Sequence, residues 1–371
     1  MKPSLTDRLA PTPPKRLLAL DGGGIRGLIS LEFLARMEEQ LRARSGGGLD
    51  VLADYFDYIG GTSTGAIIAA GLSLGMRVDE LTRFYISSGA EMFDKASWIR
   101  RFNYKYDDER LAAKLRDVFG AETTLGDERL RTLLLVVLRS ATTDSPWPLS
   151  NNPRAKYNDL ARSDSNLRLP LWQIVRASTA APTYFPPEVV QVGRQSFVFQ
   201  DGGVTMYNNP ALQLFLMATL DEYRLGWPTG EDRMLLVSVG TGAAADANAN
   251  LAPDQMNLLY NAASVPSALM SAASVQQDTL CRVLGRCRHG AAIDREVGDF
   301  TGSAGLLQPR LFSYLRYNVD LSAGGLSSLG LGDIEPERVQ RLDSIDYMDD
   351  LRAVGQAAAG QQVKAEHFDG F

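Results

Sequence analysis

Histidine and cysteine are scarce in this chain of 371 residues, which holds only two of each. The cysteines, Cys281 and Cys287, form neither a disulfide framework nor a zinc-binding spacing, and they fit a reducing cytosol best. The two histidines, His289 and His367, argue against a multi-histidine metal centre. We therefore expect a cytoplasmic protein that works without a metal.

Net positive charge and long apolar runs are also missing. The formal net charge of -6 offers no basic field to a nucleic-acid polymer, and an anionic membrane would repel it, so any lipid contact must be local and apolar. The most apolar run, Ala66 to Gly75, has about half of the roughly 20 residues that a membrane-spanning helix needs. A content of 45% hydrophobic residues instead predicts a compact fold with a sizeable core and no membrane span.

The chain divides into three parts by composition. Residues 1–14 are rich in proline and have no apolar segment of a signal peptide, so we expect a flexible arm. Residues 15–242 are expected to form the core of the fold. Residues 243–371 are expected to be a mostly helical extension that packs on this core. Within this extension, Ala243 to Pro253 is expected to be a mobile loop and Gly355 to Phe371 a weakly held tail.

Apolar runs that stop at glycines alternate with segments of helical periodicity. The expected strands are Leu17–Leu20, Tyr55–Ile59, Leu133–Leu138, Ser196–Phe199 and Met234–Val239. The expected helices follow Gly27 and Gly65 and cover Val78–Ser88, Asp108–Phe119, Ala211–Tyr223 and most of Gln255–Leu284. Such alternation predicts an α/β fold around a mainly parallel sheet.

The segment from Asp21 to Gly27 (Asp-Gly-Gly-Gly-Ile-Arg-Gly) lies between a strand and a helix. Its glycine spacing fits a dinucleotide-binding turn, an oxyanion hole made of backbone N–H groups, or a merely structural turn. The dinucleotide interpretation needs an acidic residue at the end of a second strand, about 20 residues further on. The stretch Gly46 to Asp50 is instead a glycine-rich loop after a helix.

Gly61 to Gly65 (Gly-Thr-Ser-Thr-Gly) matches the nucleophile elbow of serine hydrolases, because it also joins a strand to an apolar helix. Ser63 is then either an activated nucleophile or an ordinary N-cap of the helix. A nucleophile needs a base, and neither His289 nor His367 lies in a segment typical of a catalytic triad.

Asp201 is the better candidate for that base. It follows an expected strand and precedes Gly202 and Gly203, a sequence that is also common in simple turns. An aspartate with its ordinary pKa of about 3.9 is a weak base at neutral pH. Desolvation would raise that pKa and let the carboxylate take the proton of Ser63 directly.

Together the three motifs resemble those of the patatin-like phospholipases, whose pattern D-G-G-G-x-R-G, G-x-S-x-G and D-G-[GA] is present without a departure. The resemblance covers roughly Arg16 to Gly242 and includes three further stretches: Ala177–Pro187, Asn208–Pro210 and Ser238–Gly242. It implies a three-layer α/β/α fold with a central, mainly parallel sheet, in which residues 15–242 are the catalytic core and residues 243–371 a regulatory extension. It also implies a phospholipase of A type that releases fatty acids from membrane glycerophospholipids through an acyl-serine, without a metal or other cofactor.

By the same resemblance, Ser63 is the nucleophile and Asp201 the general base. The implied oxyanion hole consists of Gly22, Gly23, Gly24 and Arg26. The glycines that complete the motifs are Gly27, Gly61, Gly65, Gly202 and Gly203.

Beyond Gly242, the stretches Asp278–Arg282, Asp294–Asp299 and Tyr314–Asn318 resemble bacterial members of the family that a cyclic dinucleotide activates in antiphage (CBASS-type) defence. Such enzymes degrade the cell's own membrane, which they approach peripherally from the cytoplasm, and an oligomer formed on activation is compatible with this role. Arg282, Arg286 and Arg288 are candidate ligands of the activator's phosphates, or else solvated residues of a basic helix end.

Three other interpretations stay open from the residues alone. The chain is a nucleotide-binding oxidoreductase if the glycine motif binds a dinucleotide. It is a Ser-Asp-His esterase of α/β-hydrolase type if a histidine serves Ser63. It is a non-enzymatic α/β ligand-binding module if Ser63 only caps a helix.

Overall fold

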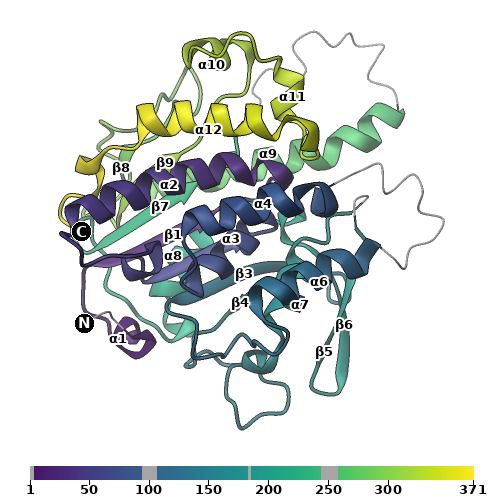
Figure 1. Cartoon of the computed structure of the whole chain (residues 1–371). Coiled ribbons are helices and arrows are strands. Elements are labelled where there is room, and N and C mark those ends of the chain that lie inside the picture. Colours follow the sequence, from purple (N-terminus) through teal and green to yellow (C-terminus); the bar gives the residue numbers. More distant parts are fainter. Residues whose placement is uncertain (1–3, 94–106, 183–184, 244–257) are drawn as a thin grey trace.

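Helices cover both faces of a single central sheet in the computed structural model (Figure 1). The structure describes residues 4–93, 107–182, 185–243 and 258–371, and within them nine strands form this sheet. The strand order is β5-β6-β3-β2-β1-β7-β9-β8, with β4 paired to β3 off this path. The strands are β1 (Lys15–Leu20), β2 (Tyr58–Thr62), β3 (Leu133–Ser140), β4 (Ser145–Ser150), β5 (Glu188–Val192), β6 (Gln195–Asp201), β7 (Met234–Val239), β8 (Arg286–His289) and β9 (Ser313–Tyr317).

The middle of the sheet is parallel, because each strand in the series β3-β2-β1-β7-β9-β8 pairs in parallel with the next. Strands β4, β5 and β6 add antiparallel pairs at one end. Alternate residues of a strand serve opposite faces: Leu18 and Leu20 of β1 join one core, and Leu17 and Ala19 join the other. Burial on both faces explains why these strands are continuous apolar runs in the sequence.

The two helical layers complete the predicted three-layer α/β/α fold, which is confirmed. Helices α2, α3, α4 and α12 lie over one face, while α8 lies over the other (Figure 1). The helices are α1 (Leu5–Leu9), α2 (Gly27–Arg44), α3 (Thr64–Ser73), α4 (Val78–Phe93), α6 (Asp107–Phe119), α7 (Leu171–Ser178), α8 (Ala211–Thr219), α9 (Leu258–Leu284), α10 (Ala323–Ser328), α11 (Pro336–Gln340) and α12 (Met348–Gln362). Short 3-10 turns near the site are η1 (Gly24–Arg26) and η4 (Gly202–Val204).

The expected flexible arm at the N-terminus is wrong for the described residues from Ser4 onward. Ser4 caps α1, and the buried guanidinium of Arg8 pairs with Asp57 at 3.0 Å. The same guanidinium donates to the carbonyl oxygens of Phe56, at 2.6 Å, and Ala53. A buried cation with this many acceptors fixes the arm against the start of β2.

The expected weak tail is also wrong, because the end of the chain packs on the core. Helix α12 lies along α2 (Figure 1), and Arg352 of α12 pairs with Glu32 of α2 at 2.8 Å. Beyond α12, the side chain of Phe368 is fully buried. A Cβ on Gly355 would lie 2.9 Å from the Cβ of Glu32, so the two helices meet closely at this glycine. The sequence interpretation missed this contact because three of the five buried residues of α12 are the small residues Gly355, Ala358 and Ala359, which give only a weak apolar pattern.

The segment after Gly242 extends the central sheet. Strand β9 pairs in parallel with β7, and β8 adds the outer strand beyond it. The expected mobile loop from Ala243 to Pro253 lies, apart from Ala243, outside the described residues. Among the residues that the structure describes, no helix combines the length and apolarity needed to cross a membrane.

Candidate active site

Ser63 occupies the sharp turn between β2 and α3. Its φ of 55° is rare for a residue with a side chain and persists only where the surroundings impose it. A Cβ on Gly61 would lie 2.1 Å from the carbonyl oxygen of Gly65, and a Cβ on Gly65 would lie 2.3 Å from that of Leu20. Both glycines are therefore required for the turn to close against the end of β1.

A buried serine holds the backbone of this turn. The N–H of Ser63 donates to Oγ of Ser178 at 2.9 Å, and that hydroxyl donates to the carbonyl oxygen of Val137 at 2.7 Å. The side chain of Ser63 makes no capping bond to α3, which contradicts the interpretation of Ser63 as a simple helix cap. Ser178 was missed as a site residue; the only signal was its place in the stretch Ala177–Pro187.

The hydroxyl of Ser63 instead donates to Oδ2 of Asp201 at 2.6 Å, across 138 residues of sequence. The register of β3 explains this meeting. Strand β4 occupies one edge of β3, so β2 and β6 must share the other edge, where Thr62 pairs with Val137 and Asp201 pairs with Leu138. Strands β2 and β6 therefore end head to head. Ser63, which follows β2, meets Asp201, which ends β6.

Asp201 is 3% exposed, and its two oxygens have different partners. Oδ1 accepts the N–H of Gly203 at 2.6 Å and forms a turn, while Oδ2 receives the hydroxyl of Ser63. Burial raises the pKa of Asp201 to about 6, against the bonds from Ser63 and Gly203, which lower it. A Cβ on Gly202 would lie 2.2 Å from the carbonyl oxygen of Val137, so this position also needs a glycine.

The glycine loop lies beside Ser63, since a Cβ on Gly22 would lie 3.3 Å from the Cβ of that serine. The N–H of Gly22 donates to the carbonyl oxygen of Asn208 at 3.0 Å, which removes Gly22 from the expected oxyanion donors. Within the described residues, no acceptor is assigned to the N–H groups of Gly23 and Gly24. These two N–H groups can donate hydrogen bonds to an oxygen atom on which negative charge develops.

The last residues of the motif contact other elements. Arg26 donates to the carbonyl oxygen of Gln340 at 3.1 Å, and burial lowers its pKa to about 10 although nearby Asp21 opposes this. A Cβ on Gly27 would lie 2.5 Å from Oγ1 of Thr64, so Gly27 lets α2 start against α3. Arg26 thus has a partner in the C-terminal segment and keeps a positive charge at the loop.

The two histidines lie together at the end of the sheet formed by β9 and β8. Their rings stack at 4.8 Å, and Nδ1 of His367 shares a hydrogen bond of 2.6 Å with the hydroxyl of Tyr317. His289 belongs to β8, which is four strand spacings from β2 and so roughly 19 Å away. The Ser-Asp-His interpretation is therefore wrong, because neither histidine can reach Ser63.

The three candidate arginines of the activator site are not brought into one cavity. Arg282 is 2% exposed and forms a bidentate pair with Asp278 at 2.8 and 2.9 Å, so it is not a surface cation that can bind a phosphate. Arg288 donates to the carbonyl oxygens of Glu366 and Asp369. The side chain of Arg286 is 64% exposed, 3.6 Å from Glu231, and lines a cavity of about 360 Å³.

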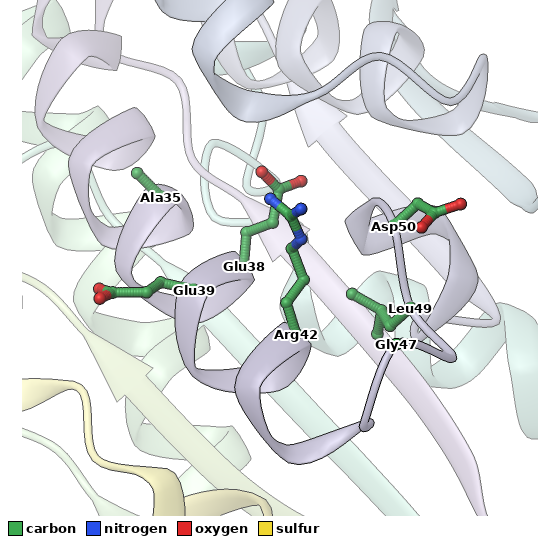
Figure 2. Close-up of a pocket in the computed structure, with 7 residues that line it drawn as sticks. All are labelled: Ala35, Glu38, Glu39, Arg42, Gly47, Leu49 and Asp50. Atoms are coloured by element: carbon green, nitrogen blue, oxygen red, sulfur yellow. The ribbon is translucent and has the colours of Figure 1, made fainter.

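A second cavity, of about 410 Å³, lies between α2 and the loop that follows it (Figure 2). Glu38 and Arg42 point into the same space there. Burial raises the pKa of Glu38, although the positive charges of Arg77 and Arg42 and a hydrogen bond with the backbone of Val78 lower it. Neither cavity is lined by Ser63 or Asp201. In the part of the chain that is described, no three His, Cys, Asp or Glu side chains are grouped as a metal site.

The dinucleotide interpretation is wrong, because the required acidic residue is absent from the end of the strand beside β1. That strand is β2, and the residues at its end are Thr62 and Ser63. The comparison with known families agrees: the model described as "Patatin-like phospholipase" matches residues 18–215. The chain belongs to the patatin-like phospholipase family.

Similar proteins come from bacteria, plants and animals. A "cGAMP-activated phospholipase" of Vibrio cholerae is 31% identical over 220 residues, which are 54% of this chain and 59% of the relative. "Patatin group D-2" of Solanum tuberosum is 30% identical over 62% of this chain and 61% of its own length. An "Intracellular phospholipase A2" of Caenorhabditis elegans is 30% identical over 71% of this chain and 21% of the relative. The chain thus matches less than two thirds of these relatives' lengths.

The elbow geometry predicts opposite effects for two glycine substitutions. Gly65→Ala should lower the free energy of unfolding by about 3 kcal/mol, because its Cβ would overlap the carbonyl oxygen of Leu20. Gly360→Ala is the control: a Cβ there meets nothing within 4 Å, and alanine should stabilise α12 by about 0.5–1 kcal/mol. Urea unfolding measures both, and equal stabilities would contradict the close approach at Gly65.

Proposed function

We propose that this family member is a metal-independent phospholipase of A type in which Ser63 and Asp201 form a catalytic dyad. The observation that carries the proposal is the hydrogen bond of 2.6 Å from Oγ of Ser63 to Oδ2 of Asp201. A serine held this way by a base, on a strained turn at the N-terminus of a helix, is an activated nucleophile. Membership of the family supports a glycerophospholipid ester as the substrate.

The first step is a proton transfer within the dyad. Oγ of Ser63 attacks the ester carbonyl carbon as its proton moves to Oδ2 of Asp201. The pKa of about 6 suits this role, because the carboxylate is mostly ionised at neutral pH yet binds a proton more tightly than an exposed aspartate. The Gly203 N–H holds the other carboxylate oxygen and keeps Oδ2 aimed at Ser63.

The remaining steps use the glycine loop and the same proton. The N–H groups of Gly23 and Gly24 stabilise the tetrahedral oxyanion. Asp201 then returns its proton to the leaving alcohol of the lysophospholipid, and the acyl group stays on Ser63. A water molecule then gives a proton to Asp201 as its oxygen attacks the acyl carbon. Asp201 returns this proton to Oγ of Ser63 when the ester bond to Ser63 breaks, which releases the fatty acid and restores the dyad.

Substitution of either dyad residue should abolish activity without unfolding the protein. Ser63→Ala and Asp201→Asn should each lower fatty-acid release from phospholipid vesicles by about 10³-fold or more. Because burial raises the pKa of Asp201, its ionised form costs stability as the pH rises through about 6, so Asp201→Asn should not lower the free energy of unfolding at pH 8. Full activity of a folded Asp201→Asn variant would refute the dyad.

The raised pKa of Asp201 also predicts the pH dependence. The base must be ionised, so kcat/KM on a water-soluble ester should fall about tenfold per pH unit below about 6 and level off above it. A histidine with the ordinary pKa of about 6.5 would give a similar midpoint. The control is the double variant His289→Gln with His367→Gln, which should keep the same profile. A midpoint near 4, or a profile that the control abolishes, would contradict the assignment.

We further propose that a cyclic dinucleotide activates this enzyme, as the name of the similar "cGAMP-activated phospholipase" of Vibrio cholerae says of that protein. The active enzyme would then act peripherally at the inner face of the cell's own membrane, and an antiviral defence role is consistent with such damage. Arg286 is the best placed of the three candidate arginines, because it is exposed and lines a cavity.

Hydrolysis of phosphatidylglycerol and phosphatidylethanolamine vesicles, with and without cGAMP, tests this regulation. We expect cGAMP to increase the rate, and Arg286→Ala to raise the half-maximal cGAMP concentration by about tenfold. Arg83→Ala, which removes a similarly exposed arginine from α4, should leave that concentration unchanged. If a panel of cyclic dinucleotides leaves the rate unchanged, the regulation is refuted while the phospholipase remains.

A further inference from the structure

We propose that Arg316, in the C-terminal segment, is a positioning residue that holds the oxyanion loop in its working shape through Asp21. This inference rests on the proposed function and adds a residue to it. Arg316 lies outside residues 18–215, which the family model matches, and it contacts the loop from the far side of β7.

The contact is a buried, bidentate ion pair. Nη1 and Nη2 of Arg316 donate to Oδ1 and Oδ2 of Asp21 at 2.9 and 2.6 Å, and both side chains are about 95% buried. Nη1 also donates to Oγ of Ser238 at 2.7 Å, and that hydroxyl donates to Oδ1 of Asn209 at 3.3 Å. One guanidinium thus joins the ends of β1 and β7 and the segment that follows Asp201.

The sheet register makes this reach possible. Ser238 of β7 pairs with Ala19 of β1 on one side and with Arg316 of β9 on the other. Asp21 lies two residues beyond Ala19, and residues two apart on an extended chain project to the same face. The guanidinium therefore crosses one strand and meets the first residue of the glycine loop.

Asp21 is the anchor from which the loop departs. The next residue, Gly22, has both backbone groups bonded: its N–H donates to Asn208, and its carbonyl accepts the hydroxyl of Thr241 at 3.1 Å. The following N–H groups, of Gly23 and Gly24, are the expected oxyanion donors. A shift of Asp21 would move these donors, and a displacement of about 1 Å can cost 10²-fold in rate.

The ion pair also controls the charge beside the oxyanion. An unpaired carboxylate at Asp21 would repel the negative charge that develops on the substrate oxygen in the transition state. Arg316 neutralises it in a site where little water is present to screen the repulsion. Geometry and charge thus both predict an effect on the chemical step more than on substrate binding.

Other parts of the C-terminal segment contact the same loop. The N–H of Ile25 donates to the carbonyl oxygen of Leu342 at 3.0 Å, and a Cβ on Gly24 would lie 2.2 Å from that oxygen. Arg26 donates to Gln340. The C-terminal segment therefore forms one wall of the loop, with Arg316 as its charged contact.

The test compares Arg316→Lys with Arg8→Lys in the full chain. Lysine keeps the charge but cannot form the bidentate pair. Arg8 is the matched control, because its ion pair with Asp57 is also buried. That pair lies at the amino-terminal end of β2, whereas Asp21 follows the carboxyl-terminal end of β1. On p-nitrophenyl butyrate, Arg316→Lys should lower kcat by about tenfold or more with KM within about twofold. Labelling of Ser63 by a fluorophosphonate should slow by a similar factor, and Arg8→Lys should change neither rate by more than about twofold.

A double variant covers the case in which Arg316→Lys does not fold. Asp21→Asn with Arg316→Met removes both charges, so no buried charge is left unpaired and the chain should fold. It should still show the reduced kcat and slow labelling. Rates equal to those of Arg8→Lys in either Arg316 variant would overturn the positioning role. Absence of both hydrolysis and labelling in the unsubstituted chain, with and without cGAMP, would instead refute the proposed hydrolase itself.

Discussion

The shared edge of β3 is the constraint on which the site depends. Strand β2 occupies that edge up to Val137, and β6 takes it over at Leu138 from the opposite direction. Ser63 and Asp201 follow or end these two strands, so the backbone hydrogen bonds of the sheet determine the contact between their side chains. A shift of either strand by one residue would turn the side chain of Ser63 or Asp201 to the other face.

The site keeps two features that cost stability. Ser63 has a positive φ, and burial raises the pKa of Asp201, so the ionised carboxylate opposes folding at neutral pH. The hydrogen bond that Ser178 accepts from Ser63, the one that Gly203 donates to Asp201, and close backbone packing at Gly61 and Gly65 hold these features in place. The proposed chemistry needs both of them, because the strain exposes the hydroxyl and the desolvation makes the carboxylate a stronger base.

The C-terminal segment belongs to the same sheet and helical layers as the part of the chain that holds Ser63 and Asp201. Strands β9 and β8 extend the sheet, α12 packs on α2, and Arg316 and Leu342 contact the glycine loop. Any ligand that changed this segment would act directly on the expected oxyanion donors. The fold therefore offers a physical route from a regulatory event in the segment to the rate of the chemical step.

The sequence by itself determined the layers of the fold, the elbow at Ser63 and the candidate base Asp201, because apolar runs, glycine turns and short motifs are local patterns. It did not reveal that Gly22 is bonded to Asn208, that Arg282 is paired with Asp278, or that Ser178 supports Ser63. It also misjudged both ends of the chain, where Arg8 and Phe368 are buried. Only the tertiary structure decided these points, since each depends on which polar groups and surfaces meet after the chain has folded, and local sequence carries no record of distant partners.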